Sequence, residues 1–297
     1  MKRCKTPLRY PGGKARATNF LFDKHHWPLR KVKEYREPFL GGGSPAIAFT
    51  KRNPDIPVWV NDKYYNLYCF WKELQKNGDH LHSLIYDLKV KHHTLEKGRE
   101  LFNRCRAEIG EQTDSFEIAW RFYIINKCSF SGLTENSSFS EMSSESCWTL
   151  SNTNTILYYH KLIKNWKITN LDYRELLVDD PDTFIFLDPP YDLKKDYTMD
   201  GASGDRLYGK KGSMHQGFDH IDFQNQLSNT RSMCMITYNS NPNIRALFNE
   251  WEQTEWDLVY SMRNGHKSYE EAQKDRKELL ITNYERNSAN TLDMFFA

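Results

Sequence analysis

One segment near the N-terminus constrains the fold of this chain more than any other. A short strand is predicted over 35–40, and it runs into the turn Gly41-Gly42-Gly43-Ser44. Pro45 suits the first turn of a following helix, and a second strand over 58–60 ends at Asn61-Asp62. A strand, a glycine turn, a helix, a strand and an acid in this order predict the start of a doubly wound α/β fold with a Rossmann-like sheet.

The glycine turn also indicates a cofactor that contains adenosine. Gly41 and Gly43 let the backbone approach a ligand closely, and Asp62, 21 residues after Gly41, can accept hydrogen bonds from ribose hydroxyls. This spacing fits a nicotinamide oxidoreductase, and it fits an enzyme that binds S-adenosylmethionine equally well. The turn alone does not choose between them.

A second motif, Asp188-Pro189-Pro190-Tyr191, directly follows the apolar run 184–187, which predicts a buried strand. The two prolines end the strand abruptly, and Pro190 keeps Pro189 extended. The resulting elbow offers a carboxylate, free backbone carbonyls and an aromatic ring. These groups can hold a planar base and accept hydrogen bonds from its exocyclic amine, although a plain turn is the alternative. A dehydrogenase has no need of this motif.

The N-terminal segment is strongly basic. Residues 1–36 contain eleven Lys and Arg side chains and two acidic ones, which favours contact with a polyanion, although a solvated surface is the alternative. Within it, Lys14 follows the pair Gly12-Gly13 and could bind a carboxylate at the methionine end of the cofactor. An ordinary surface lysine is the competing interpretation.

The middle of the chain has a different pattern. It is predicted to be mainly helical from residue 66, while 128–154 is rich in Ser, Thr and Asn and is interpreted as a polar hairpin or loop. We therefore expect an insertion within one α/β domain. The expected parts are the first part of the catalytic domain over 1–65, the insert over 66–154 and the second part over 155–297.

The second half returns to strands, predicted over 166–170, 184–187 and 233–237. Residues 192–217 contain glycine and lysine and are interpreted as a flexible lid. Phe218-Asp219-His220 lies either in that lid near the substrate or at the start of a helix capped by Asp219.

Composition excludes several classes of protein. The six cysteines form no Cys-x-x-Cys pair, so free thiols in a reducing compartment are expected, and no metal site is predicted. No apolar run is long enough to span a bilayer, and the N-terminus lacks a signal-peptide segment. We expect a cytoplasmic protein of a bacterial or phage-infected cell, with no membrane partner.

In its order of motifs the chain resembles the DNA adenine-N6 methyltransferase family. The resemblance spans most of the sequence, and the ordered combination is highly specific even though each motif alone is not. Four blocks carry it: Arg9-Tyr10-Pro11-Gly12-Gly13-Lys14, Glu37-Pro38-Phe39-x-Gly41-x-Gly43-Ser44, Asn61-Asp62, and Asp188-Pro189-Pro190-Tyr191. Weaker similarities are Asn126-Lys127-x-x-Phe130-x-Gly132-Leu133, Asp172-Tyr173 and the run 278–284.

The resemblance implies S-adenosylmethionine as cofactor, double-stranded DNA as partner and the insert as the DNA-recognition region. The implied cofactor-binding residues are Tyr10, Lys14, Gly41, Gly43, Asp62 and Asp188, and the implied catalytic residues are Asp188, Pro189 and Tyr191. Asp172-Tyr173 is expected beside the adenine of the cofactor.

The chemistry of the target agrees with these roles. The N6 lone pair of adenine is delocalised into the ring, and hydrogen bonds from N6 to the Asp188 carboxylate and the Pro189 carbonyl would localise it. Tyr191 would stack on the base. Positioning alone can supply roughly 7–11 kcal/mol of the barrier, and reaching the pocket requires the base to flip out of the duplex. No metal is needed.

One position departs from the family. Members that read GATC often carry Arg-x-Asn after the Gly-Leu of the insert, where this chain has Glu135-Asn136. Arginine suits guanine and glutamate suits the cytosine amine, so specificity for GATC is not expected. The insert has ten basic and twelve acidic residues, so DNA contact is expected from the N-terminal segment and from the lysines at 194, 195, 210 and 211.

Three alternatives stay open at this point: methylation of RNA adenine, methylation of cytosine N4, and a silent DNA-binding regulator. Intact Lys14 and Asp188 argue against the regulator. The oligomeric state, a monomer or a weak dimer on DNA, is not decided by the sequence.

Overall fold

The computed structural model describes residues 4–134, 137–191, 218–257 and 277–286. The expectations for Glu135, for the lid over 192–217 and for its four lysines therefore lie outside the described residues.

Within the described residues, seven strands form one sheet in the order β3-β2-β1-β4-β5-β7-β6. The first five strands in this order run parallel to one another, whereas β7 is antiparallel to both β5 and β6. The α/β, Rossmann-like fold expected from the glycine turn is confirmed. The strands are β1 (Glu34–Glu37), β2 (Val58–Asn61), β3 (Lys167–Thr169), β4 (Thr183–Leu187), β5 (Met233–Asn239), β6 (Glu252–Asp257) and β7 (Lys277–Thr282).

Alternation along the central strands divides the core between the two faces of the sheet. Phe184 and Phe186 of β4 pack into the larger cluster, together with side chains of α2 and of the insert. Ile185 and Leu187 point to the other face, where α8 and α9 cover them. Every residue of β4 is buried, which explains its continuous apolar sequence.

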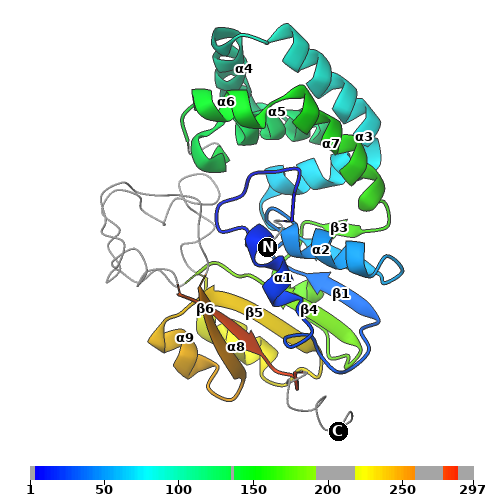
Figure 1. Ribbon diagram of the computed structural model, residues 1–297, viewed down its shortest axis with the longest axis vertical. Helices are drawn as coiled ribbons and strands as arrows, with labels where there is room; N and C mark the ends of the chain where they lie inside the picture. Colours follow the sequence, from blue (N-terminus) through cyan, green and yellow to red (C-terminus); the bar gives the residue numbers. More distant parts are fainter. Residues whose placement is uncertain (1–3, 135–136, 192–217, 258–276, 287–297) are drawn as a thin grey trace, which may run out of the picture.

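The helices separate into two groups, as Figure 1 shows: α3 to α7 gather at one end of the molecule, and the others flank the sheet. They are α1 (Thr18–Leu21), α2 (Ser44–Arg52), α3 (Tyr65–Lys91), α4 (Leu95–Glu108), α5 (Ser115–Cys128), α6 (Glu141–Cys147), α7 (Leu150–Leu162), α8 (His220–Leu227) and α9 (Pro242–Leu247). The 3-10 turns used below are η1 (Lys14–Arg16), η3 (Phe130–Gly132) and η5 (Tyr173–Leu176).

Part of the polar segment is helical, which corrects the expectation of a hairpin or loop throughout 128–154. Among its described residues, hairpin-like pairing lies at its start, where Ser129 bridges Phe139. The hydroxyls of Ser140 and Thr149 then cap α6 and α7. Residue 154, the expected end of the insert, lies inside α7.

The start of the chain has little regular structure. After Gly13 it forms the short turn η1 and the four-residue α1. This irregular backbone holds Lys14 against the edge of the sheet, where its side chain is almost completely buried.

Candidate active site

Parallel strands β1, β2, β4 and β5 bring their carboxyl ends to one edge of the sheet, and the strand order reverses between β1 and β4. Ligands of open α/β sheets bind at such a point. The structure places the glycine turn after β1, Asp62 after β2 and Asp188 after β4 at this edge.

Lys14 and Asp188 form an ion pair across 174 residues of sequence. The Lys14 ammonium lies 2.8 Å from Asp188 Oδ1 and 3.0 Å from Oδ2, and it also donates to the carbonyl of Gly12 at 3.0 Å. The Lys14 side chain is 1% exposed, whereas that of Asp188 is 22% exposed. The surface-lysine alternative is therefore wrong, and the carboxylate keeps an open side.

A residue that the sequence reasoning missed also contacts Asp188. The hydroxyl of Thr237, on β5, donates to Asp188 Oδ1 at 2.7 Å, and Thr237 is fully buried. The available signal was a polar residue inside the apolar run 233–238, but nothing in the local sequence names its partner.

Tyr191 lies beside the Lys14–Asp188 ion pair. Its hydroxyl donates to Glu278 Oε2 at 2.6 Å, and Glu278 is itself buried on β7. The Lys14 ammonium lies 5.0 Å from the centroid of the Tyr191 ring. The centroids of the Tyr191 and Tyr238 rings are 5.9 Å apart. The ring orientation of Tyr191 is thus held from the antiparallel part of the sheet.

Asp62 holds the glycine turn in place. Its carboxylate accepts from the backbone N–H groups of Gly41 at 2.8 Å and Tyr64 at 2.9 Å. Burial raises the pKa of the Asp62 carboxyl to about 6, although these two N–H donors oppose the shift. Each oxygen retains a lone pair, so the carboxylate can still accept from a ligand.

Tyr10 packs against the same turn. A Cβ atom at Gly41 would lie only 2.9 Å from Tyr10 Cε1, so the Tyr10 ring leaves no room for a side chain at this position. Gly41 and Gly43 both have positive φ, at 49° and 68°, which favours glycine. The structure therefore brings together all of the residues implied for cofactor binding: Tyr10, Lys14, Gly41, Gly43, Asp62 and Asp188.

Glu37 is a further buried carboxyl at this edge that was not assigned a role. It accepts from the Tyr35 hydroxyl at 2.6 Å and is 1% exposed. Burial raises the pKa of Glu37 well above its usual range, and the nearby Asp188 and Asp62 carboxylates act in the same direction.

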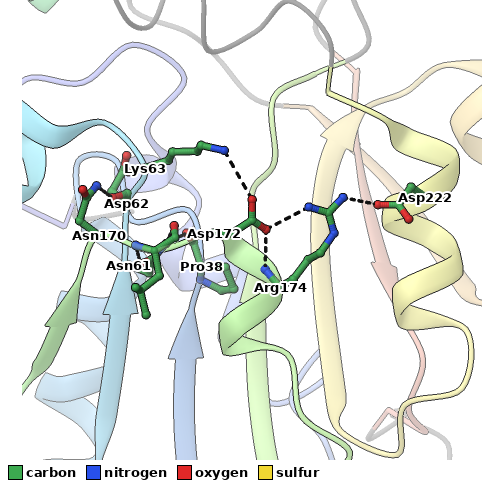
Figure 2. Close-up of polar contacts among 9 residues, drawn as sticks. Pro38, Asn61, Asp62, Lys63, Asn170, Asp172, Arg174 and Asp222 are labelled. Atoms are coloured by element: carbon green, nitrogen blue, oxygen red, sulfur yellow. Dashed lines mark hydrogen bonds and ion pairs between the residues drawn. The ribbon is translucent and has the colours of Figure 1, made fainter.

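Asp172 begins a chain of charges between the end of β2 and α8, shown in Figure 2. It caps η5 and lies 3.5 Å from the Lys63 ammonium and 3.1 Å from Arg174, which in turn pairs with Asp222 of α8. In the same view Asn61 donates to the carbonyl of Pro38, so the ends of β1 and β2 are joined. These surface charges contribute little stability, and they link the segments after β2 and β3 to α8.

The insert is joined to the N-terminal segment through Asn126 of α5. Its Oδ1 accepts from the N–H of Arg9 at 2.9 Å, and its Nδ2 donates to the carbonyl of Arg9 at 2.6 Å. The Arg9 guanidinium donates to the carbonyl of Ser129 at 2.9 Å. The segment that carries Tyr10 and Lys14 is therefore fixed against the insert.

Beyond the elbow, Asp219 caps α8 by accepting from the N–H groups of Ile221 and Asp222. The helix-start interpretation of this segment is thus confirmed. In the ranges that the structure describes, no group of three or more His, Cys, Asp or Glu could hold a metal ion. Among those same residues, no helix has the length and apolar character needed to cross a membrane.

The comparisons with known proteins agree with this geometry. The model of a family described as D12 class N6 adenine-specific DNA methyltransferase matches residues 10–262. A Type II methyltransferase, M.CviBI of Paramecium bursaria Chlorella virus NC1A, is 26% identical over 76% of this chain and 81% of its own length. M.MjaIII of Methanocaldococcus jannaschii, another Type II methyltransferase, is 24% identical over 62% of this chain and 68% of its own length.

Proposed function

Because the chain belongs to the D12 class N6 adenine-specific DNA methyltransferases, an enzyme family that transfers a methyl group from a donor to DNA adenine, we propose that its donor is S-adenosylmethionine. We further propose that Asp188, Pro189 and Tyr191 act on the target base. The observation that carries this assignment is the Lys14–Asp188 pair, which lies at the same sheet edge as the glycine turn held by Asp62.

The chemistry of the edge fits the proposed cofactor. The ribose hydroxyls suit Asp62, whose oxygens each keep a lone pair. The positive φ angles of Gly41 and Gly43 shape the turn that Asp62 holds, and the rings of Tyr10 and Trp71 fill the space beside these two glycines. When bound, S-adenosylmethionine supplies an electrophilic methyl group.

Asp188 is suited to orient the adenine amine. Its carboxylate is partly exposed and charge-balanced by Lys14, so it can accept a hydrogen bond from N6 without leaving an unpaired buried charge. The Pro189 carbonyl is the second proposed acceptor, and Tyr191, held by Glu278, is the proposed stacking ring. The base must flip from the duplex to reach them.

The proposed substrate is double-stranded DNA, read by the insert, with specificity other than GATC because Glu135 stands where GATC readers carry arginine. The names of the two relatives favour a role in a restriction–modification system. The reaction would take place in the cytoplasm, where unmodified DNA and the donor meet, by a monomer or a weak dimer.

Transfer of labelled methyl from S-adenosylmethionine to unmodified bacterial DNA tests these roles. We expect wild-type protein to form N6-methyladenine and Asp188→Ala to lose roughly 100- to 1,000-fold in rate, as when one preorganised hydrogen-bonding group is removed. Asp179→Ala is the matched control, since that carboxylate pairs with Arg231 on the surface. Asp188→Ala at the wild-type rate would contradict the assignment.

A further inference from the structure

The geometry points to Thr237 as a positioning residue for methyl transfer: its hydroxyl fixes the plane in which the Asp188 carboxylate meets the target amine. This inference rests on the proposed role of Asp188. Thr237 is not expected to touch the base or the cofactor, because it is fully buried within β5.

The pairing of β4 with β5 explains why these two side chains meet. The strands are parallel, and Phe186 lies opposite Met235 and Leu187 opposite Ile236. Phe186 and Met235 both pack on the larger-cluster face, and residues two positions later in a strand share that face. The side chains of Asp188 and Thr237 therefore project from the same face side by side, and the hydroxyl lies 2.7 Å from the carboxylate.

The two donors at Asp188 leave part of its carboxylate open. A carboxylate can accept about four hydrogen bonds. The Lys14 ammonium donates to Oδ2 at 3.0 Å and lies 2.8 Å from Oδ1, and the Thr237 hydroxyl donates to Oδ1 at 2.7 Å. The carboxylate thus retains acceptor capacity, and its side chain is still 22% exposed.

The two donors also differ in how firmly they fix the carboxylate. The Lys14 ammonium spans both oxygens, so a tilt of the carboxylate plane changes its contacts little. Lysine is also a flexible point charge. The Thr237 hydroxyl comes from a β-branched side chain on a central strand and contacts one oxygen, so it resists that tilt.

Single-turnover methyl transfer by Thr237→Val and Thr237→Ser tests this inference. Valine keeps the shape and removes the hydroxyl, so we expect the rate to fall about tenfold, the cost of a misplaced reacting group, with dissociation constants for S-adenosylmethionine and DNA unchanged. Serine keeps the hydroxyl and should stay within about threefold of wild type. Thr237→Ala removes the same hydroxyl without adding a methyl group, and it should match valine.

Thr183→Val is the matched control. Thr183 is also fully buried, at the start of β4, and its hydroxyl donates to the Asp180 carboxylate at 2.8 Å, away from the site. It should lose stability but not rate. Valine and serine variants that are equally slow would assign Thr237 a packing role and overturn the inference, as would a valine variant at full rate.

Asp188→Ala in the same assay separates a failure of the proposed role of Asp188 from a failure of the role inferred for Thr237. If that variant retains transfer, the proposed role of Asp188 fails and Thr237 has nothing to position. If Asp188→Ala is inactive while Thr237→Val keeps the wild-type rate, only the assignment of Thr237 is overturned.

Discussion

At the residue scale, the site contains carboxylates that hold the fold together and are also proposed to contact the ligands. The Asp62 carboxylate joins Gly41 to Tyr64 by accepting a hydrogen bond from the backbone N–H of each, and its pKa is raised to about 6 by burial. Asp188 is instead matched by a cation and a hydroxyl. The first carboxylate thus has a charge that changes near neutral pH, although both lie on the same sheet edge.

This difference predicts a pH-dependent affinity for the cofactor. A carboxyl with a pKa of about 6 is ionised at pH 7 and mostly protonated at pH 5, and protonation removes acceptors for the ribose hydroxyls. If only the ionised form binds, affinity falls as pH decreases and should be about tenfold weaker at pH 5 than at pH 7.

Calorimetric titration of S-adenosylmethionine between pH 5 and pH 7 measures this effect. Asp62→Asn should bind S-adenosylmethionine weakly, because the amide has one acceptor oxygen in place of two. Its affinity should not change with pH, because the amide cannot titrate. Equal pH dependence in wild type and variant would show that another group is responsible.

At the scale of elements, the glycine turn joins β1 to α2 through a conformation that only glycine adopts easily. Gly43 has φ of 68°, and a Cβ on it would lie 2.7 Å from Trp71 Cζ2. Trp71 is fully buried and donates to the carbonyl of Gly41 at 3.1 Å, so it has little room to move. The turn, α2 and α3 therefore pack as one unit.

Gly43→Ala is consequently expected to destabilise the protein by about 3 kcal/mol, from left-handed backbone strain plus displacement of Trp71. Gly110→Ala is the matched control, since a Cβ there meets nothing within 4 Å and should change stability by less than about 0.5 kcal/mol. Urea unfolding monitored by tryptophan fluorescence compares the two. Equal losses for both variants would contradict the packing argument.

Elements with strong local signals were predicted from sequence, and elements held by tertiary packing were not. The run 184–187 and the turn at Gly41 specify β4 and the β1–α2 connection by residue type alone. The serine-rich α6 has no such pattern, because serine has low helix propensity and the helix depends on its cap and its buried face. Likewise, Thr237 could not be paired with Asp188 before the strand register was known.

At the scale of the whole molecule, the N-terminal segment is one of the places where the insert meets the rest of the fold. Asn126 takes both backbone groups of Arg9, a few residues before Lys14 contacts Asp188. A side chain of the proposed DNA-reading region therefore supports the segment that holds Asp188, the proposed catalytic carboxylate. Movement of the insert on DNA would be transmitted to the site along this short path.

Asn126→Ala breaks that path at one point. The variant leaves the N–H and the carbonyl of Arg9 without their partner, and each unsatisfied buried group costs about 1–3 kcal/mol. We expect a lower urea midpoint for unfolding. We also expect slower single-turnover methyl transfer to DNA, because the segment that holds Lys14 against Asp188 is no longer fixed. Asn154→Ala on the exposed face of α7 is the control, since that residue accepts a hydrogen bond from His82 at the surface. If Asn126→Ala lost stability but kept the wild-type rate, the insert would support the fold without positioning the active site.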